Sequence, residues 1–210
     1  MIRFPDIHSH HIQNNGFQLI NQTVESFDSS VEYFSIGWHP WSVENYNDAD
    51  FETLIEYAQL INCKAIGECG LDKNISTSLQ KQLPLFEKQL QLAFNLNKPV
   101  ILHCVKAFQE IVNVCTPYIG KIPLVIHGFN KNTTLAKQLI DKGFYISLGQ
   151  SLVYKKDLAS LPLESLVLET DDAIFPIKDL YQIIADYQSK DIEVIEKQIV
   201  ENVTKILKLV

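Results

Sequence analysis

Asp6-Ile7-His8-Ser9-His10, an Asp-x-His-x-His motif, closes a short apolar run at residues 2–7. Successive side chains of a β-strand point to opposite faces, so positions 6, 8 and 10 share one face. Imidazole nitrogens and a carboxylate oxygen are donors that a divalent metal ion uses. The motif alone leaves two interpretations open: a metal site at a strand end, or a histidine-rich terminal segment. Ligands elsewhere in the chain decide between them.

Short apolar runs of this kind recur along the chain, each bounded by glycine, proline or a polar residue. They are mostly β-branched or aromatic, which is typical of buried parallel strands. The runs are residues 2–7, 33–37, 65–68, 100–103, 124–127, 144–148 and 166–169, with residues 17–22 as a candidate eighth.

Amphipathic stretches separate the runs and predict helices at residues 50–61, 77–93, 107–115, 133–142, 181–187 and 191–209. Thr77 and Gln80 form a capping-box pattern. Pro84 favours a late start or a kink in the same helix, and Asp191 is positioned to cap the last one. Strands that alternate with helices predict an α/β fold with a parallel sheet.

The region between His10 and Tyr33 departs from this rhythm, because no helix is predicted there. A parallel crossover normally takes a dozen or more residues. We therefore predict a distorted (β/α) TIM-type barrel of seven or eight strands with its first helix trimmed. The length of 210 residues suits one domain spanning residues 1–210, since such barrels run to about 250 residues.

The composition, 46% apolar and 20% charged, is that of an ordinary soluble globular protein. No apolar run approaches the ~20 residues of a membrane helix, and the first residues lack a secretory signal. These features predict a cytoplasmic protein with no membrane partner. The cysteines form no CxxC pair, so we expect reduced thiols; they are Cys63, Cys69, Cys104 and Cys115.

The net charge of −7 bears on the substrate. A protein that grips long duplex nucleic acid usually presents a basic face, because phosphate neutralisation supplies most of the affinity. The densest lysine cluster here is Lys155-Lys156. If the substrate carries phosphates, metal ions must neutralise them, which favours a small or end-bound substrate.

Potential metal ligands lie at or just beyond the carboxyl ends of the predicted strands. Taken singly, each has another interpretation: a loop glutamate, a hydrogen-bonded core histidine or a helix-capping acid. In a closed barrel, however, these strand ends meet on one face. Four histidines and two carboxylates exceed the needs of one tetrahedral ion and suit two ions with a bridging carboxylate. The six are His8, His10, Glu68, His103, His127 and Asp171.

The order of these landmarks resembles that of the TatD-type metal-dependent deoxyribonucleases, within the amidohydrolase-like barrels. The resemblance covers essentially the whole chain. Its landmarks are Asp6-Ile7-His8-Ser9-His10, Gly37-Trp38-His39-Pro40, Gly67-Glu68-Cys69-Gly70-Leu71-Asp72, Pro99-Val100-Ile101-Leu102-His103, His127-Gly128-Phe129, Gly143-Phe144-Tyr145-Ile146-Ser147, Leu168-Glu169-Thr170-Asp171 and Glu201-Asn202-Val203.

The resemblance implies a distorted TIM barrel with a divalent-metal site, and it implies roles for individual residues. One ion would be held by His8, His10, Glu68 and Asp171. The second would be held by Glu68, His103 and His127, with Glu68 bridging the two. Asp171 would also orient or deprotonate the attacking water.

The chain departs from the family pattern at three places. The segment after His10 is shorter than in typical members, and Cys104-Val105 stands where the family usually has Ser-Arg. After Asp171 comes Asp172-Ala173-Ile174-Phe175-Pro176, where the family usually has Ala-Pro and a longer loop with arginine and asparagine. Arginine grips phosphate bidentately. The departures therefore weaken the case for nuclease activity and leave metal binding intact.

Other residues near the motifs have two interpretations each. His39 is predicted to bind substrate from a strand end, although Pro40 also marks an ordinary turn. The aromatic residues Trp38, Trp41 and Phe129 could stack on a base or pack over the barrel mouth. His11 faces the opposite way to the motif and is expected to be a loop histidine.

Together these features predict a metal-dependent hydrolase acting on ester bonds, a phosphodiesterase or deoxyribonuclease that uses metal-activated water. Asp171, as general base, and Glu68 are the predicted catalytic residues. The expected cofactors are two divalent ions (Zn, Mn, Co, Fe or Mg). The expected substrate is a small or end-bound phosphodiester, with single-stranded DNA ends as one candidate; the oligomeric state stays open. Two alternatives remain: a metal-dependent ester, lactone or amide hydrolase, and a non-catalytic metal-binding barrel.

Overall fold

A computed structural model describes residues 2–13 and 16–209. The chain forms two compact units: a terminal unit, Met1–Ile20 with Val125–Val210, and a central unit, Asn21–Leu124. The described residues contain the strands β1 (Asp6–Ser9), β2 (Gln18–Gln22), β3 (Phe34–Ile36), β4 (Cys63–Asp72), β5 (Val100–Val105), β6 (Leu124–Ile126), β7 (Tyr145–Leu148) and β8 (Leu166–Leu168). The α-helices are α1 (Asp48–Ala58), α2 (Leu79–Asn95), α3 (Phe108–Cys115), α4 (Thr133–Asp141), α5 (Lys178–Gln188) and α6 (Ile192–Leu207).

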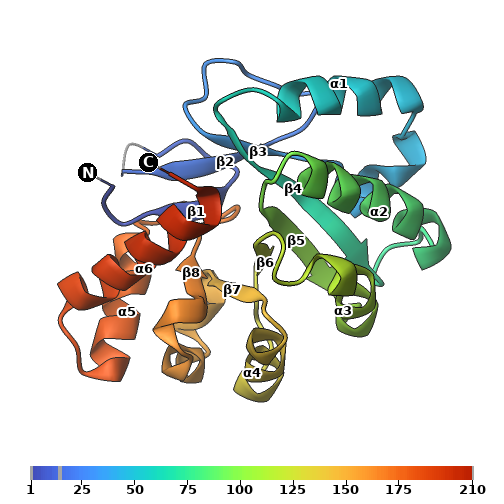
Figure 1. Cartoon of the computed structure of the whole chain (residues 1–210). Coiled ribbons are helices and arrows are strands. Elements are labelled where there is room, and N and C mark those ends of the chain that lie inside the picture. The colour runs from blue at the N-terminus through green and yellow to red at the C-terminus, as the bar shows by residue number, and fades with distance from the viewer. Residues whose placement is uncertain (1, 14–15, 210) are drawn as a thin grey trace. The chain divides into compact units, whose positions relative to one another are not determined.

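Within the central unit, β3 pairs with β4 and β4 pairs with β5, all in parallel. The helix α2 packs on β4 (Figure 1) and buries Phe86 and Leu90. This helix begins at Leu79 after the N-cap residue Ser78, and Pro84 lies inside it. The predicted capping box and the alternative of a late start are therefore wrong. Gln82 explains the difference, because its side-chain amide donates to the carbonyl of Thr77 at 2.7 Å and anchors the first turn.

Within the terminal unit, β6, β7 and β8 pair in parallel, and β1 pairs with the start of β2. A parallel bridge joins Ser9, at the end of β1, to Asp171, just beyond β8. The last strand thus returns beside the first, as barrel closure requires. The helices α5 and α6 lie side by side (Figure 1). Asp191 is the N-cap residue of α6, as predicted, but its side chain makes no capping hydrogen bond.

The structure agrees with the predicted trimming of the first helix. Among the described residues between β1 and β3 there is no helix. The first strand is shorter than the apolar run at residues 2–7, because it begins only at Asp6. Pro5 has no N–H to give to a sheet, and Phe4 has a left-handed backbone with φ of 44°. One domain spanning residues 1–210 stays a prediction.

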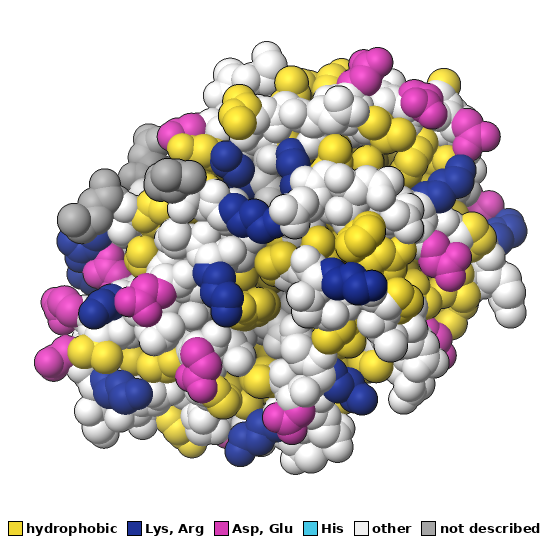
Figure 2. All heavy atoms as spheres, in the orientation of Figure 1, with side chains coloured by type: hydrophobic (Ala, Val, Ile, Leu, Met, Phe, Trp, Pro, Cys, Tyr) yellow, Lys and Arg dark blue, Asp and Glu magenta, His cyan; other side chains and the backbone are white. Residues whose placement is uncertain are grey.

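The surface and the cysteines bear on the compositional predictions. Cys63, Cys69 and Cys115 are buried thiols. None of the helices in the described residues is long and apolar enough to cross a membrane. On the face drawn in Figure 2, lysine and arginine side chains lie scattered among acidic and apolar ones.

Candidate functional site

The terminal unit brings three of the predicted ligands together. The carboxylate of Asp171 lies 3.5 Å from Nε2 of His8 and 3.5 Å from Nε2 of His10. One ligand atom from each of the three residues lies within 4.8 Å of the others. His8 is fully buried, whereas the side chains of His10 and Asp171 are 32% and 40% exposed. The site is therefore anchored inside the fold and open to solvent on one side.

The backbone places this carboxylate. The N–H of Asp171 donates to the carbonyl of His8 at 3.0 Å, and the N–H of His10 donates to the carbonyl of Asp171 at 3.0 Å. Asp171 adopts a left-handed conformation with φ of 54°, which aspartate tolerates better than most residues. The turn after β8 thus directs the carboxylate towards the two imidazoles.

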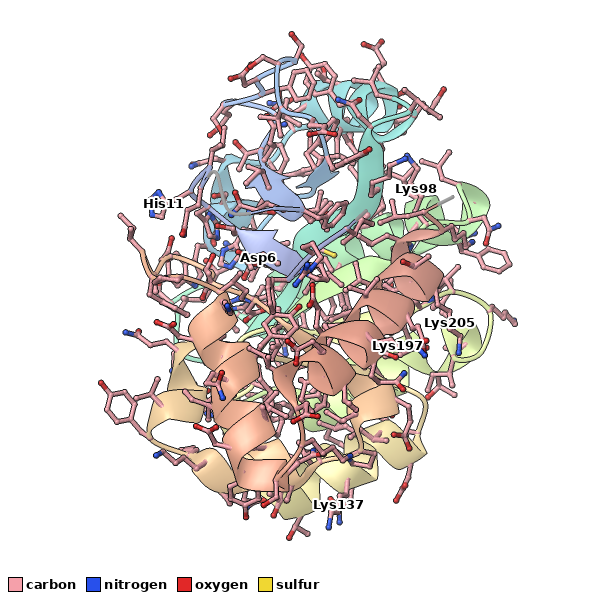
Figure 3. The ribbon with its side chains drawn as sticks, turned by 90° about the vertical axis from the view of Figure 1, so that its left-hand side faces the viewer. Asp6, His11, Lys98, Lys137, Lys197 and Lys205 are labelled. Atoms are coloured by element: carbon pink, nitrogen blue, oxygen red, sulfur yellow. The ribbon has the colours of Figure 1, made fainter. Side chains whose placement is uncertain are left out.

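Asp6 supports this turn through hydrogen bonds from Thr170. It is 1% exposed, and its carboxylate accepts hydrogen bonds from the backbone N–H of Thr170 at 3.0 Å and from the Thr170 hydroxyl at 2.6 Å. Burial raises the pKa of Asp6 to about 6, while the bonds from Thr170 and Gln18 oppose that rise. Figure 3 shows Asp6 among the strands. These contacts make Asp6, the first residue of β1, a hydrogen-bonding residue that holds the turn after β8.

His127 lies beside the same cluster and contacts a carboxylate that the sequence analysis missed. Its ring centroid is 4.5 Å from that of His8, and its Nδ1 is 3.6 Å from the carboxylate of Glu169. Glu169 is fully buried and accepts hydrogen bonds from the Gly128 N–H and the Ser147 hydroxyl. A signal was present, because Glu169 closes the apolar run at residues 166–169 and stands two positions before the predicted ligand Asp171. We call His8, His10, His127, Glu169 and Asp171 the terminal cluster.

The central unit holds a second group, His39, Glu68 and His103, which we call the central cluster. The carboxylate of Glu68 lies 2.5 Å from Nδ1 of His103 and 3.3 Å from Nε2 of His39. The two imidazoles approach within 3.1 Å. One donor atom of each residue again lies within 4.8 Å of the others. The residue predicted to bind substrate, His39, therefore stands among potential ligands; its substrate role stays a prediction.

Gly70 on β4 allows this strand to approach the backbone of His103 on β5. A Cβ atom at Gly70 would lie 2.0 Å from the carbonyl oxygen of His103. The φ of Gly70 is also +151°, which side chains rarely adopt. No other residue type fits here without moving the backbone that presents His103.

The carboxylate of Asp72 lies on the opposite side of the His103 ring. Its Oδ2 is 3.5 Å from Nε2 of His103, whereas Nδ1 of the same ring faces Glu68. Histidines that bind metals commonly direct their other ring nitrogen to a carboxylate, which fixes the tautomer. Asp72 is 3% exposed and was also missed as a site residue, although it ends a quoted landmark.

Both clusters fit divalent metal ions by the chemistry of their donors. Neutral imidazole nitrogens with one or two carboxylate oxygens suit zinc, manganese, cobalt or iron. A divalent cation would also balance the negative charge of Glu68, a carboxylate only 6% exposed, which is costly to bury by itself. The terminal unit contributes His8, His10, His127 and Asp171 of the predicted ligands, and the central unit contributes Glu68 and His103.

Solvent exposure distinguishes the three aromatic residues that could stack on a base. Trp38 and Phe129 are 5% and 2% exposed, so they pack inside the protein, whereas Trp41 is 66% exposed. His11 projects outward in Figure 3 and is exposed, as expected for a loop histidine.

Comparisons with known proteins place this geometry in context. The model of one protein family, described as TatD related DNase, matches residues 8–208. An uncharacterized metal-dependent hydrolase of Haemophilus influenzae is 32% identical over 184 residues, covering 79% of this chain and 68% of the relative. A protein of Pantoea ananatis named 3'-5' ssDNA/RNA exonuclease TatD is 28% identical over 200 residues, covering 83% of this chain and 77% of the relative.

A crystal structure of a TatD homolog from Escherichia coli K12 matches the fold. The TM-score is 0.81 at 22% identity, and the match covers 100% of this chain and 99% of that one. With the eight strands found in the described residues, this match confirms the predicted (β/α) TIM-type barrel.

Proposed function

The chain belongs to the TatD related DNase family, and from that premise we propose that it is a divalent-metal-dependent hydrolase of nucleic-acid phosphodiesters. The observation that carries the proposal is the terminal cluster, where His8, His10 and Asp171 bring donor atoms within 4.8 Å of one another. The name of the Pantoea ananatis relative specifies single-stranded DNA and RNA as the substrates of that protein. We propose single-stranded ends as the substrate here.

We propose that two divalent ions bind, and that the residues of the terminal cluster and of the central cluster would hold them; the bridging role of Glu68 stays a prediction. When bound, such ions lower the pKa of a coordinated water and neutralise charge on phosphoryl oxygens. Zinc, manganese, cobalt and iron match the mixed donors best, and magnesium is the remaining candidate.

The protein's own groups position ligands and move the proton. Asp171 is partly exposed beside two imidazoles, so it can accept the proton of the attacking water within one hydrogen bond. Asp6 holds the turn that carries Asp171, through Thr170. Glu169 and Asp72 face the rings of His127 and His103 and fix their orientation.

The charge distribution limits the size of the substrate. The net charge is −7, and Arg3 is the single arginine in the sequence. Its guanidinium pairs with the buried carboxylate of Glu196, so it serves the fold. No other arginine is present to bind the successive phosphates of a long strand bidentately. The proposed substrate is therefore a short strand or a strand end.

The shortage of arginines also favours a second candidate function. The same donors could activate water against a carboxylic ester, lactone or amide, whose reaction develops charge on one oxygen only. Metal ions alone can stabilise that charge. This candidate shares the metal sites and differs in the substrate.

The test is metal analysis followed by a hydrolysis panel. The purified protein is loaded with Zn, Mn, Co, Fe or Mg, and its metal content is measured. The substrates are a single-stranded oligodeoxynucleotide, bis(4-nitrophenyl) phosphate and 4-nitrophenyl acetate. The variants are Glu68→Ala and, as a matched control, Glu87→Ala, which removes an exposed carboxylate on α2.

We expect the wild type and Glu87→Ala to cleave the oligonucleotide and the diester, and Glu68→Ala to lose both metal and activity. Cleavage of the acetate alone would replace the nuclease proposal with the second candidate. Full metal content without turnover of any substrate would favour a non-catalytic barrel. Unchanged metal content in Glu68→Ala would exclude the bridging role.

A further inference from the structure

Trp41 is a large aromatic residue that the fold leaves in solvent beside the central cluster. It is 66% exposed, whereas the chain's other tryptophan, Trp38, is 5% exposed. The ring of Trp41 lies 4.8 Å from that of His39 at 88° and 6.2 Å from that of His103 at 77°. An exposed indole in contact with potential metal ligands offers a face to whatever binds there.

The ring is held in place. The indole N–H of Trp41 donates to Oδ2 of Asp72 at 2.8 Å. Asp72 is fixed in turn, because its carboxylate accepts from the backbone N–H of Asn74 at 2.7 Å and its own N–H donates to the side chain of Gln82 at 2.8 Å. Because the polar edge is bound to a buried carboxylate, little conformational entropy remains to be lost when a ligand stacks on the ring.

Trp41 is also linked to the central cluster through the backbone, because it lies two positions after His39. Pro40 and Trp41 open a 3-10 helix whose N-cap is His39, and the His39 side chain accepts the backbone N–H of Trp41 at 3.2 Å. A nucleotide whose phosphate reaches the central cluster carries its base one sugar away from that phosphate. The Trp41 ring, 4.8 Å from the His39 ring, lies within reach of such a base. Bases stack on exposed aromatic rings with little preference for sequence, because every base has a π-face.

We propose that Trp41 is the stacking platform for the nucleobase next to the scissile phosphodiester. The inference rests on the proposed function, and it names the part of the substrate that the protein grips. Stacking supplies orientation at a site where the chain has no arginine to grip phosphate. The competing role for Trp41 is to shield the histidines from solvent, with no contact to a base.

Tryptophan fluorescence tests the contact without any turnover. Thymidine 5'-monophosphate is titrated into metal-loaded protein, with deoxyribose 5-phosphate as the probe that lacks a base. We expect saturable quenching by the nucleotide, little by the sugar phosphate, and none by either probe in Trp41→Phe, where only buried Trp38 remains. Equal quenching in Trp41→Phe, or no quenching in the wild type, would overturn the proposal.

Kinetics separate stacking from shielding. For an oligodeoxynucleotide we expect Trp41→Ala to raise KM about 10- to 100-fold, the range measured for loss of base stacking, with kcat largely retained and Trp41→Phe close to wild type. For an oligonucleotide with an abasic terminal residue, Trp41→Ala and wild type should have equal KM values. Tyr154→Ala, which removes another exposed aromatic ring, should match wild type on both.

Metal content decides the competing role. If Trp41→Ala loses metal in proportion to its activity, Trp41 shields the cluster and the proposal is wrong. If no oligonucleotide is cleaved by any variant, the proposed function fails, and the fluorescence titration still decides whether Trp41 binds a base.

Discussion

Asp6 and Thr170 are joined by two hydrogen bonds, at 3.0 and 2.6 Å, although they stand 164 positions apart in the sequence. The contact ties the first strand to the turn after the last one. Because Asp171 follows Thr170 directly, a bond that stabilises the fold also sets the position of the predicted general base. Stability and activity should therefore change together when this contact is altered.

Thr170→Val tests that link. The substitution preserves shape and removes the hydroxyl that donates to buried Asp6, so we expect the free energy of unfolding to fall by about 1–3 kcal/mol. Hydrolytic activity should fall as well. Thr170→Ser keeps the hydroxyl and should stay close to wild type in both. Denaturant unfolding measures the first effect, and a loss of stability without any loss of activity would separate the two roles.

Asp171→Asn tests the predicted base. The amide cannot accept the proton, so kcat should fall by about 10²- to 10⁴-fold, the usual contribution of general acid–base catalysis. Asp172→Asn changes the adjacent exposed carboxylate and serves as the matched control. Steady-state kinetics on metal-loaded protein give the answer; equal kcat values for the two variants would reject the assignment.

Gly70→Ala tests the close approach of β4 and β5. The new Cβ would meet the His103 carbonyl at 2.0 Å, whereas at Gly120, which also has a positive φ of +75°, it would meet nothing within 4 Å. Gly120→Ala carries only the backbone strain of about 1–3 kcal/mol. Gly70→Ala adds overpacking of similar size and should unfold at clearly lower denaturant concentration. Equal midpoints for the two variants would contradict the clash.

Tyr181→Phe tests a buried hydroxyl and its pH dependence. The Tyr181 hydroxyl donates to the carbonyl of Pro5 at 2.8 Å, so its loss should lower the free energy of unfolding by about 1 kcal/mol near pH 7. Burial, together with the nearby carboxylates of Asp6 and Glu196, raises the pKa of Tyr181 well above its usual value.

The pH dependence has a definite sign. Above about pH 10 the unfolded chain releases this proton while the folded protein retains it, so the stabilising contribution is lost as pH rises. Wild type should therefore lose more stability than Tyr181→Phe between neutral and strongly alkaline pH. Urea unfolding at a series of pH values measures the difference, and parallel curves for the two proteins would show that Tyr181 does not titrate as described.

The aromatic residues show where prediction from sequence stopped. Trp38, Trp41 and Phe129 all adjoin predicted site residues, and nothing in their local pattern distinguishes stacking from packing. Burial made the distinction, because it depends on which distant segments cover each ring. The same limit applied to the start of α2, because the helix begins at Leu79, before Pro84, where Gln82 contacts Thr77.

The sequence by itself determined the alternation of strands and helices, the missing first helix and the types of donor at the strand ends. These features follow from local periodicity and from residue chemistry, which are properties of short stretches. Only the tertiary structure decided that Asp6 holds Thr170, that Glu169 and Asp72 back His127 and His103, and that Trp41 stays exposed. Such pairs lie far apart in sequence, and no local pattern specifies which buried carboxylate meets which ring. The fold sets those contacts, because a buried carboxylate must find hydrogen-bond partners wherever the packed chain provides them.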